Sequence, residues 1–94
     1  MKLKWLRKAL ENIDAQATYI SQENPKYASQ FVSKIFDAVK HLETFPRMGR
    51  AGKIEGTYEL VVTGLPYVIV YRIRNEDIEI LRVLHTSRKW PPSF

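Results

Sequence analysis

The segment ILRVLHTSRKWPP, residues 80–92, combines an apolar stretch with side chains suited to binding a partner. Its polar and aromatic part consists of Arg82, His85, Arg88, Lys89 and Trp90, and two prolines follow. Arginine and tryptophan are frequent binding anchors, and proline keeps a segment out of helices and sheet ladders. The pattern predicts a stiff, cationic and aromatic tail that binds a macromolecular target through these five residues. The alternative is that Trp90 folds back onto the core, while Arg88 and Lys89 are simply solvated.

The composition argues against metal binding and thiol chemistry. The chain has no cysteine, so disulfides and thiolate ligands are excluded. Its two histidines, His41 and His85, lie far apart and lack the spacing of a ligand pair. We therefore expect neither a metal site nor a cofactor.

Positive charge is concentrated at the two ends of the chain. The formal net charge is +5 at pH 7, with +4 in residues 1–10, −2 in residues 11–45 and +3 in residues 46–94. Such a field favours a polyanion or an acidic protein as partner. The N-terminal segment lacks the continuous apolar run of a signal peptide, and no later segment is long and apolar enough to cross a bilayer. We expect a cytoplasmic protein that does not bind membranes.

The elements that must position these residues follow from the hydrophobic period. Apolar residues recur at three- and four-residue steps over residues 6–20 and again over residues 28–45, which predicts two helices. Between them, Asn24 is a good helix cap and Pro25 suits a first turn, so the helices form a hairpin. Residues 46–56 contain the glycines and charges of an exposed loop.

Beyond this loop the hydrophobic period falls to two. The stretches TYELVVTG, YVIVYRIR and IEILRVLH predict three strands joined by turns at LP and NED, and LKWL near the N-terminus predicts an opening strand. The predicted order is β-α-α-β-β-β in a single domain of residues 1–94. This is an α+β fold with a helical hairpin packed on one face of a mainly antiparallel sheet.

Alternation divides the middle strand of this sheet between two faces. Val68, Val70, Arg72 and Arg74 share one face, and the helical hairpin can cover only one. If these residues face away from the helices, they form with Val61 an open apolar patch, which a small monomer seldom exposes. The pattern predicts a protein partner bound over these five residues.

Three further stretches carry a family resemblance when they follow a helical hairpin in this order. They are FPRMGRAGKIEGTYELVV, PYVIVYRI and IEILRVLHTSRKWP. With them the chain resembles the RelE/ParE superfamily of bacterial toxins over nearly its whole length. The resemblance implies the toxin of a type II toxin–antitoxin module of the kind known for plasmid stabilisation. It also implies a cognate antitoxin that covers the apolar patch and binds operator DNA, which the toxin itself meets only indirectly.

The resemblance leaves two classes of target. RelE-like toxins cleave messenger RNA on the ribosome with lysines and an arginine on the open sheet face, whereas ParE-like toxins inhibit DNA gyrase. Where the nuclease cations are expected, this chain has Glu59, Val61 and Val68. Valine can neither donate to a phosphate nor move a proton. The resemblance therefore favours the ParE-like branch, a gyrase-inhibiting binding protein rather than an enzyme.

The alternative is a ribosome-dependent, metal-independent mRNA endoribonuclease. Some nuclease members use a glutamate, an arginine and a histidine, which would make Glu59 the base, Arg72 or Arg74 the phosphate stabiliser and His85 the acid. Each residue also has a structural interpretation: Glu59 as an arginine's partner, the two arginines paired with acids in or after the NED turn, and His85 as a hydrogen-bonded framework residue. A more distant alternative is a member that has lost toxicity and acts only as a corepressor with its antitoxin.

Overall fold

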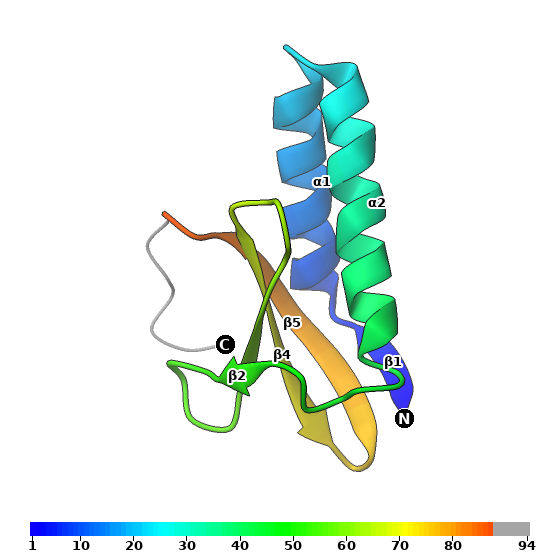
Figure 1. Ribbon diagram of the computed structural model, residues 1–94, viewed down its shortest axis with the longest axis vertical. Helices are drawn as coiled ribbons and strands as arrows, with labels where there is room; N and C mark the ends of the chain where they lie inside the picture. The colour runs from blue at the N-terminus through cyan, green and yellow to red at the C-terminus, as the bar shows by residue number, and fades with distance from the viewer. Residues whose placement is uncertain (88–94) are drawn as a thin grey trace.

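Two antiparallel helices cover one face of a five-stranded sheet (Figure 1). The computed structural model describes residues 1–87, so Arg88, Lys89 and Trp90 of the predicted binding tail lie outside the described residues. The elements are β1 (Lys2–Trp5), α1 (Arg7–Ser21), α2 (Pro25–His41), β2 (Arg50–Ala51), β3 (Tyr58–Val61), β4 (Tyr67–Arg74) and β5 (Asp77–His85). This arrangement confirms the predicted α+β fold.

The helical hairpin begins and turns where the sequence indicates. The Asn24 side chain accepts a hydrogen bond from the Tyr27 backbone N–H at 3.0 Å, and Pro25 is the first residue of α2. However, α2 ends at His41, before the predicted end at Phe45. The N–H groups of Thr44 and Phe45 both bond to the His41 carbonyl in a closing turn. Because Pro46 follows, Phe45 is disfavoured in helical conformation.

The sheet has the strand order β1-β5-β4-β3-β2. β1 pairs with β5 in parallel, and the remaining neighbours pair antiparallel. The two-residue strand β2 lies inside the stretch that the sequence predicted as a loop, and it pairs Arg50 with Glu59 and Ala51 with Tyr58. β2 therefore covers only the first half of the outer edge of β3.

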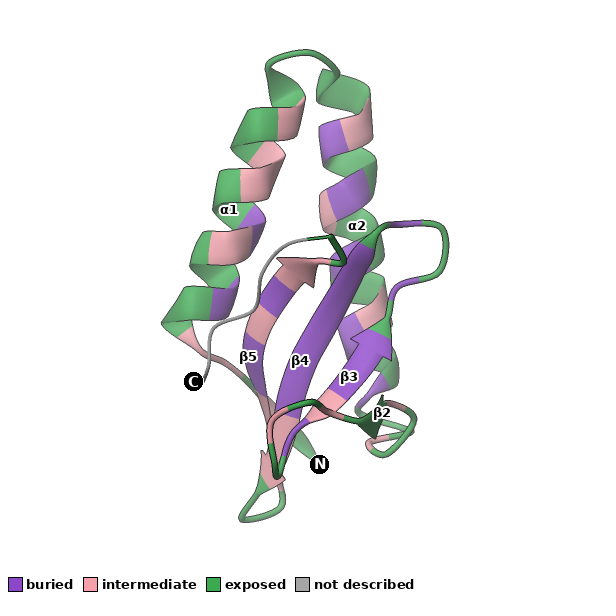
Figure 2. Ribbon diagram, turned by 90° about the vertical axis from the view of Figure 1, so that its left-hand side faces the viewer, coloured by how far each residue is buried: buried purple, intermediate pink, exposed green. Residues whose placement is uncertain are grey.

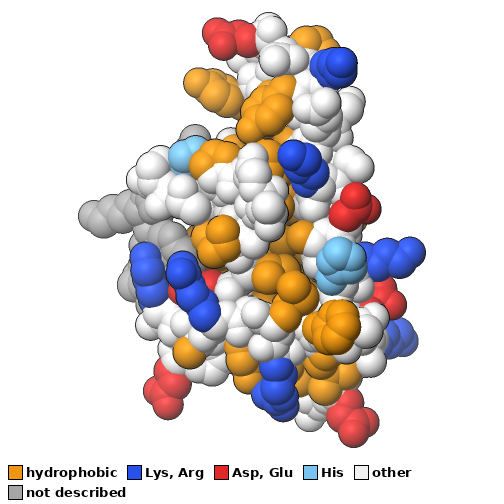
Figure 3. Space-filling model, viewed as in Figure 1, with side chains coloured by type: hydrophobic (Ala, Val, Ile, Leu, Met, Phe, Trp, Pro, Cys, Tyr) orange, Lys and Arg blue, Asp and Glu red, His pale blue; other side chains and the backbone are white. Residues whose placement is uncertain are grey.

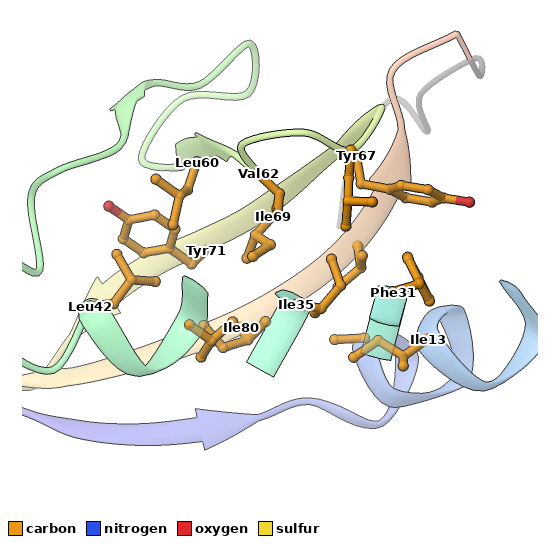
Figure 4. Close-up of a cluster of buried hydrophobic side chains, with 14 of the residues drawn as sticks. Ile13, Phe31, Ile35, Leu42, Leu60, Val62, Tyr67, Ile69, Tyr71 and Ile80 are labelled. Carbon is orange, nitrogen blue, oxygen red and sulfur yellow. The ribbon is translucent and has the colours of Figure 1, made fainter. Parts of the chain in front are cut away.

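A single large core fills the space between the helices and the sheet. Phe31 and Ile35 project from α2 toward Ile69 and Tyr71 of β4 and Ile80 of β5 (Figure 4). All five side chains are fully buried. The core thus ties α2 to the two central strands, which are the scaffold on which any surface site depends.

A β-bulge in β5 changes which of its residues face the helices. The register passes from Tyr71 opposite Ile80 to Val70 opposite Arg82, so Leu81 is an extra residue. Before the bulge, Ile80 faces the core, whereas after it Val83 does so. His85 lies opposite Tyr67, whose side chain belongs to the core, and it therefore also falls on the helix-facing side.

Candidate interaction surface

Glu59 is a buried anchor for the loop that precedes β3. Its side chain is only 2% exposed and forms an ion pair with Arg50, with 3.2 Å between Oε1 and the guanidinium Nη2. The other oxygen, Oε2, accepts the backbone N–H of Lys53 at 2.7 Å. Both carboxylate oxygens are engaged, which confirms the interpretation of Glu59 as an arginine's partner.

The two arginines of β4 continue this charged region along the open face. Arg72 donates from Nε to the Glu79 carboxylate on the neighbouring strand, which confirms the predicted pairing. Arg74 is exposed and lies opposite Asp77, whose carboxylate is 2.9 Å from the Lys4 ammonium of β1. Ion pairs on this half of the sheet therefore join β1 to β5, β5 to β4, and β3 to β2.

His85 is separated from these groups by the thickness of the sheet. Its ring packs edge-on against Tyr67 on the helix-facing side, with ring centroids 5.1 Å apart. Its Nδ1 atom accepts the Ser87 backbone N–H at 3.1 Å and lies 2.7 Å from the Ser87 hydroxyl. Because Nδ1 is an acceptor, the neutral ring carries its proton on Nε2.

The candidate nuclease residues are consequently not brought together. Glu59 lies opposite Val70 and Arg72 lies opposite Glu79 on the open face, whereas His85 faces the helices. The bulge at Leu81 is the physical reason, since uninterrupted alternation would have placed His85 on the same face as Glu79. The same bulge places Arg82 opposite Val70, where it donates from Nη1 to the Leu81 carbonyl.

The open face is not the exposed apolar patch that alternation predicted. Figure 2 views this face, and the buried residues run along β4. Val68 and Val70 are 3% and 0% exposed and pack with Leu81, Leu6 and Leu84. The prediction that Val68 and Val70 are accessible is wrong, since both side chains are buried in this apolar cluster. Among the three valines, Val61 alone is exposed, at 49%.

One accessible apolar surface instead lies beside β3. Val61 and Met48, at 48% exposure, line one groove there, and Phe45 in the turn after α2 is 62% exposed. Figure 3 shows hydrophobic side chains gathered on this side of the molecule. A groove of about 240 Å³ separates β3 from α2, and we call it the β3 groove. It is lined by Lys34, Asp37, Ala38, His41, Met48, Leu60, Val61, Val62 and Thr63.

Sequence reasoning missed Phe45 and Met48 as surface residues. The hydrophobic period places Phe45 at the end of the second predicted helix, and Met48 lies in the predicted loop of glycines and charges. The available signal was two large apolar residues beside a proline and two arginines where the predicted helix meets the loop, FPRMGR. Apolar side chains in an exposed loop are a reason to expect a partner.

Tyr71 holds the loop that carries Met48 against the sheet. Its hydroxyl donates to the Pro46 carbonyl at 2.9 Å and accepts the Gly49 N–H at 3.0 Å. Burial raises the pKa of the Tyr71 hydroxyl above its ordinary value. Its ring stacks on Tyr58, which receives a hydrogen bond from Arg47 at 2.7 Å. The position of Met48 is therefore fixed from both sides.

The described part of the chain offers no place for a metal or a membrane span. Residues 1–87 contain no group of three or more histidine, cysteine, aspartate or glutamate side chains that could hold a metal ion. Within the same residues, no helix is long and apolar enough to cross a membrane.

Comparison with known proteins agrees with the fold. Residues 3–90 match the model of the ParE toxin of the type II toxin–antitoxin system parDE. The chain is 40% identical over 90 residues to the Sinorhizobium fredii protein named "Putative toxin Y4kP", covering 96% of this chain and 93% of that protein. It is 30% identical over 84 residues to "Toxin RelE2" of Caulobacter vibrioides, covering 89% of this chain and 93% of that protein.

A solved structure shares the architecture. The structure described as "Chromosomal ParDE TA system from P. aeruginosa" superimposes with a TM-score of 0.83 at 30% identity, covering 90% of this chain and 95% of that chain. A helical hairpin on a mainly antiparallel sheet with this sequence similarity defines a toxin of the RelE/ParE superfamily. Within that superfamily, the chain belongs to the ParE toxin family, the toxins of parDE type II toxin–antitoxin systems.

Proposed function

We propose that this toxin acts by binding and inhibiting DNA gyrase, and that a cognate antitoxin holds it inactive. The observation that carries the proposal is the separation of Glu59 and His85 on opposite sheet faces. Metal-free cleavage of RNA needs a base, an acid and cations around one phosphate. Inhibition by binding needs no such set, so the open face can be occupied by ion pairs and packed valines.

Two predicted target contacts lie near the end of β5. Arg82 projects on the open face and His85 on the helix-facing side. A partner that contacts both Arg82 and His85 must therefore bind around the end of β5, because one flat sheet face presents only one of them. The predicted contacts Arg88, Lys89 and Trp90 follow directly in sequence.

The antitoxin half of the proposal is supported by the apolar surface at the β3 edge. A 94-residue chain that leaves Val61 and Met48 nearly half exposed and Phe45 62% exposed presents apolar surface that a partner would cover. The toxins of the matching family belong to parDE toxin–antitoxin systems. We therefore expect the antitoxin to be the partner that covers this surface.

Gyrase inhibition can be tested with purified components. We expect the toxin, without ribosomes, to block supercoiling of relaxed plasmid by DNA gyrase, and addition of the antitoxin to restore it. The Glu59→Gln variant keeps the shape of the side chain but cannot act as a base. Its inhibitory concentration should remain within about threefold of wild type, provided that thermal melting shows it folded.

The ribosome-dependent nuclease remains the second candidate, favoured by the relative named "Toxin RelE2". Unimpaired gyrase together with codon-dependent mRNA cuts in cells expressing the toxin would reverse the proposal. Loss of toxicity in a folded Glu59→Gln variant would point the same way. In that case binding to the ribosome would have to bring Glu59 and His85 to the same phosphate.

A further inference from the structure

We propose that the open face of the sheet binds the phosphate backbone of duplex DNA, and that in the inhibited complex this is the DNA held by gyrase. The choice of DNA rests on the proposed function, whereas an anionic ligand is inferred from the charges of the face itself. This binding is independent of base sequence and separate from operator binding by the antitoxin. It reassigns Arg72 and Arg74, which the sequence predicted as antitoxin contacts.

Cations flank an acid in two rows of residues that cross the strands of the sheet. In the first row, Asp77 of β5 lies between Lys2 of β1 and Arg74 of β4. The second row repeats this order of charges with Lys4, Glu79 and Arg72. Neighbouring residues along the strands, among them Ile73 and Ile78, pack in the core on the helix side, so both rows lie on the open face. Each row therefore carries one excess positive charge.

A third row lies beyond the bulge and has the same balance of charge. Arg82 of β5 is opposite Val70 of β4, and Glu59 of β3 lies between Val70 and Arg50 of β2. Val70 packs in the apolar cluster of the open face, which places this row on the same side. Together the three rows contain six cations and three acids, an excess of three positive charges.

This excess is the whole net charge of the described chain. Residues 1–87 contain thirteen lysines and arginines and ten aspartates and glutamates. Outside the three rows, seven cations and seven acids remain and cancel, and the helical hairpin, residues 6–45, has five of each. Residues 88–94 add two cations and no acidic side chain. A polyanion is therefore attracted to the open face in preference to the helices.

The cations of the rows are accessible to a ligand. The side chains of Arg50 and Lys4 are 65% and 53% exposed, although each forms an ion pair. Lys2 and Arg74 are exposed and form no ion pair within residues 1–87, since the carboxylate of Asp77 between them pairs with Lys4. Lys2 and Arg74 can therefore bind a phosphate without giving up such a pair.

The distribution of these charges suits a phosphate backbone rather than a single small anion. Four of the six cations are arginines, whose planar guanidinium groups bind phosphate through paired hydrogen bonds. Successive rows are about 7 Å apart, because two residues of a strand span that distance, and the three rows extend over about 13 Å. Duplex DNA presents a negative charge about every 1.7 Å along its axis and can meet all three rows.

The salt dependence of DNA binding tests the number of phosphates that the face contacts. Fluorescence anisotropy measures binding of the purified toxin, without gyrase, to two short duplexes of unrelated sequence. Three neutralised phosphates predict a slope of about −2.7 for the logarithm of the association constant against the logarithm of the salt concentration. Raising the salt about fourfold should therefore weaken binding by about 40-fold, equally for both duplexes.

A double variant tests whether the open face is responsible. Lys2→Gln with Arg74→Gln removes two of the three excess charges and breaks no ion pair of residues 1–87. We expect the slope to fall to about −0.9 and the affinity at low salt to fall by at least about tenfold.

The matched control removes the same charge from the helical hairpin. Lys26→Gln with Lys40→Gln changes two exposed residues of α2. This control should keep the slope and bind DNA within about threefold of wild type. Circular dichroism verifies that both double variants are folded. Equal weakening by the two double variants would overturn the inference, because net charge and not the open face would then determine binding.

The supercoiling assay links DNA binding to gyrase inhibition. At a salt concentration where the wild type binds DNA, the inhibitory concentration of Lys2→Gln with Arg74→Gln should rise at least about fivefold, whereas the control should stay within about twofold. Weaker DNA binding with unchanged inhibition would overturn the inference, since the open face would not contact DNA in the inhibited complex.

The remaining outcomes separate this inference from the proposed function. A toxin that inhibits gyrase but binds neither duplex would overturn the inference and leave gyrase inhibition intact. Salt-dependent DNA binding without gyrase inhibition would overturn the proposed function and the assignment to DNA held by gyrase. Binding of single-stranded RNA at least about tenfold tighter than DNA would assign the face to RNA, and equal binding of polyglutamate would assign it to an acidic protein. Either of these two results would overturn the inference.

Discussion

At the scale of single residues, Tyr71 shows how one buried hydroxyl positions a surface. It bonds to Pro46 and Gly49 on either side of Met48, so the exposed methionine is held by a core residue. Glu59 does the same for the next part of the loop through Arg50 and Lys53. Both residues have side chains that could do chemistry, yet their contacts are those of structural anchors.

The Tyr71→Phe variant should lower the free energy of unfolding by about 1–2 kcal/mol, because two hydrogen bonds to one buried hydroxyl are lost. Urea denaturation at pH 7 measures this difference. Tyr19→Phe is the matched control, since Tyr19 is 69% exposed and should change stability by less than about 0.5 kcal/mol.

The raised pKa of Tyr71 adds a pH signature to the same variant. The folded protein resists ionisation of this hydroxyl more than the unfolded chain, whose tyrosine has the ordinary value of 10.0. The stability that it contributes is therefore complete below pH 10.0 and is lost as pH rises through the higher folded value. Tyr71→Phe should lose less stability than wild type in this alkaline range. Parallel alkaline losses in both proteins would contradict the assignment.

At the scale of elements, the β4–β5 hairpin carries strain in its turn. Asn75 and Glu76 have positive φ values of 52° and 66° and form the two-residue connection between Arg74 and Asp77. Asparagine tolerates this conformation, whereas glutamate has no side-chain compensation for it. The turn fixes the register that places Arg72 opposite Glu79.

Glu76→Gly should therefore stabilise the protein by about 0.5–1 kcal/mol, the strain of one left-handed residue less the entropy cost of glycine. Thermal melting at neutral pH reports the gain as a higher midpoint. Glu55→Gly removes the same exposed charge where φ is not positive and should give no gain. A similar rise for both variants would mean that charge, and not backbone strain, is responsible.

At the scale of the whole molecule, the helices and the sheet should unfold as one unit. The hairpin helices have 15 and 17 residues and would be marginal in isolation, so their stability comes from packing on the sheet. Ile35 lies at the centre of this contact and is fully buried. The open face adds a smaller cluster, but it involves the same strands β4 and β5.

Ile35→Ala should cost about 2–5 kcal/mol, because it leaves a cavity between α2 and the central strands. Helix content by far-ultraviolet circular dichroism and tryptophan fluorescence should still report one coincident denaturation curve, shifted to lower urea. The comparison variant is Val61→Ala on the exposed edge, which should shift the curve little. Separate transitions for helix and sheet signals would show that the domain is not cooperative.

The sequence by itself determined the features that depend on neighbouring residues along the chain. Hydrophobic period located both helices and the three main strands, and Asn24 with Pro25 marked the hairpin turn. Family resemblance was likewise present in ordered local stretches. These features are readable because capping, turn chemistry and amphipathic period act over a few residues.

Tertiary structure alone decided which side chains meet and which remain accessible. One inserted residue, Leu81, moved His85 to the opposite face from Glu59, and no alternation pattern reveals such an insertion in advance. Val68 and Val70 are buried in an apolar cluster with Leu81, whereas Val61 lies beyond the residues that pair with β2 and is exposed. Faces and edges of a sheet depend on register and on partners distant in the chain, which is why the accessible apolar residues could be located only in three dimensions.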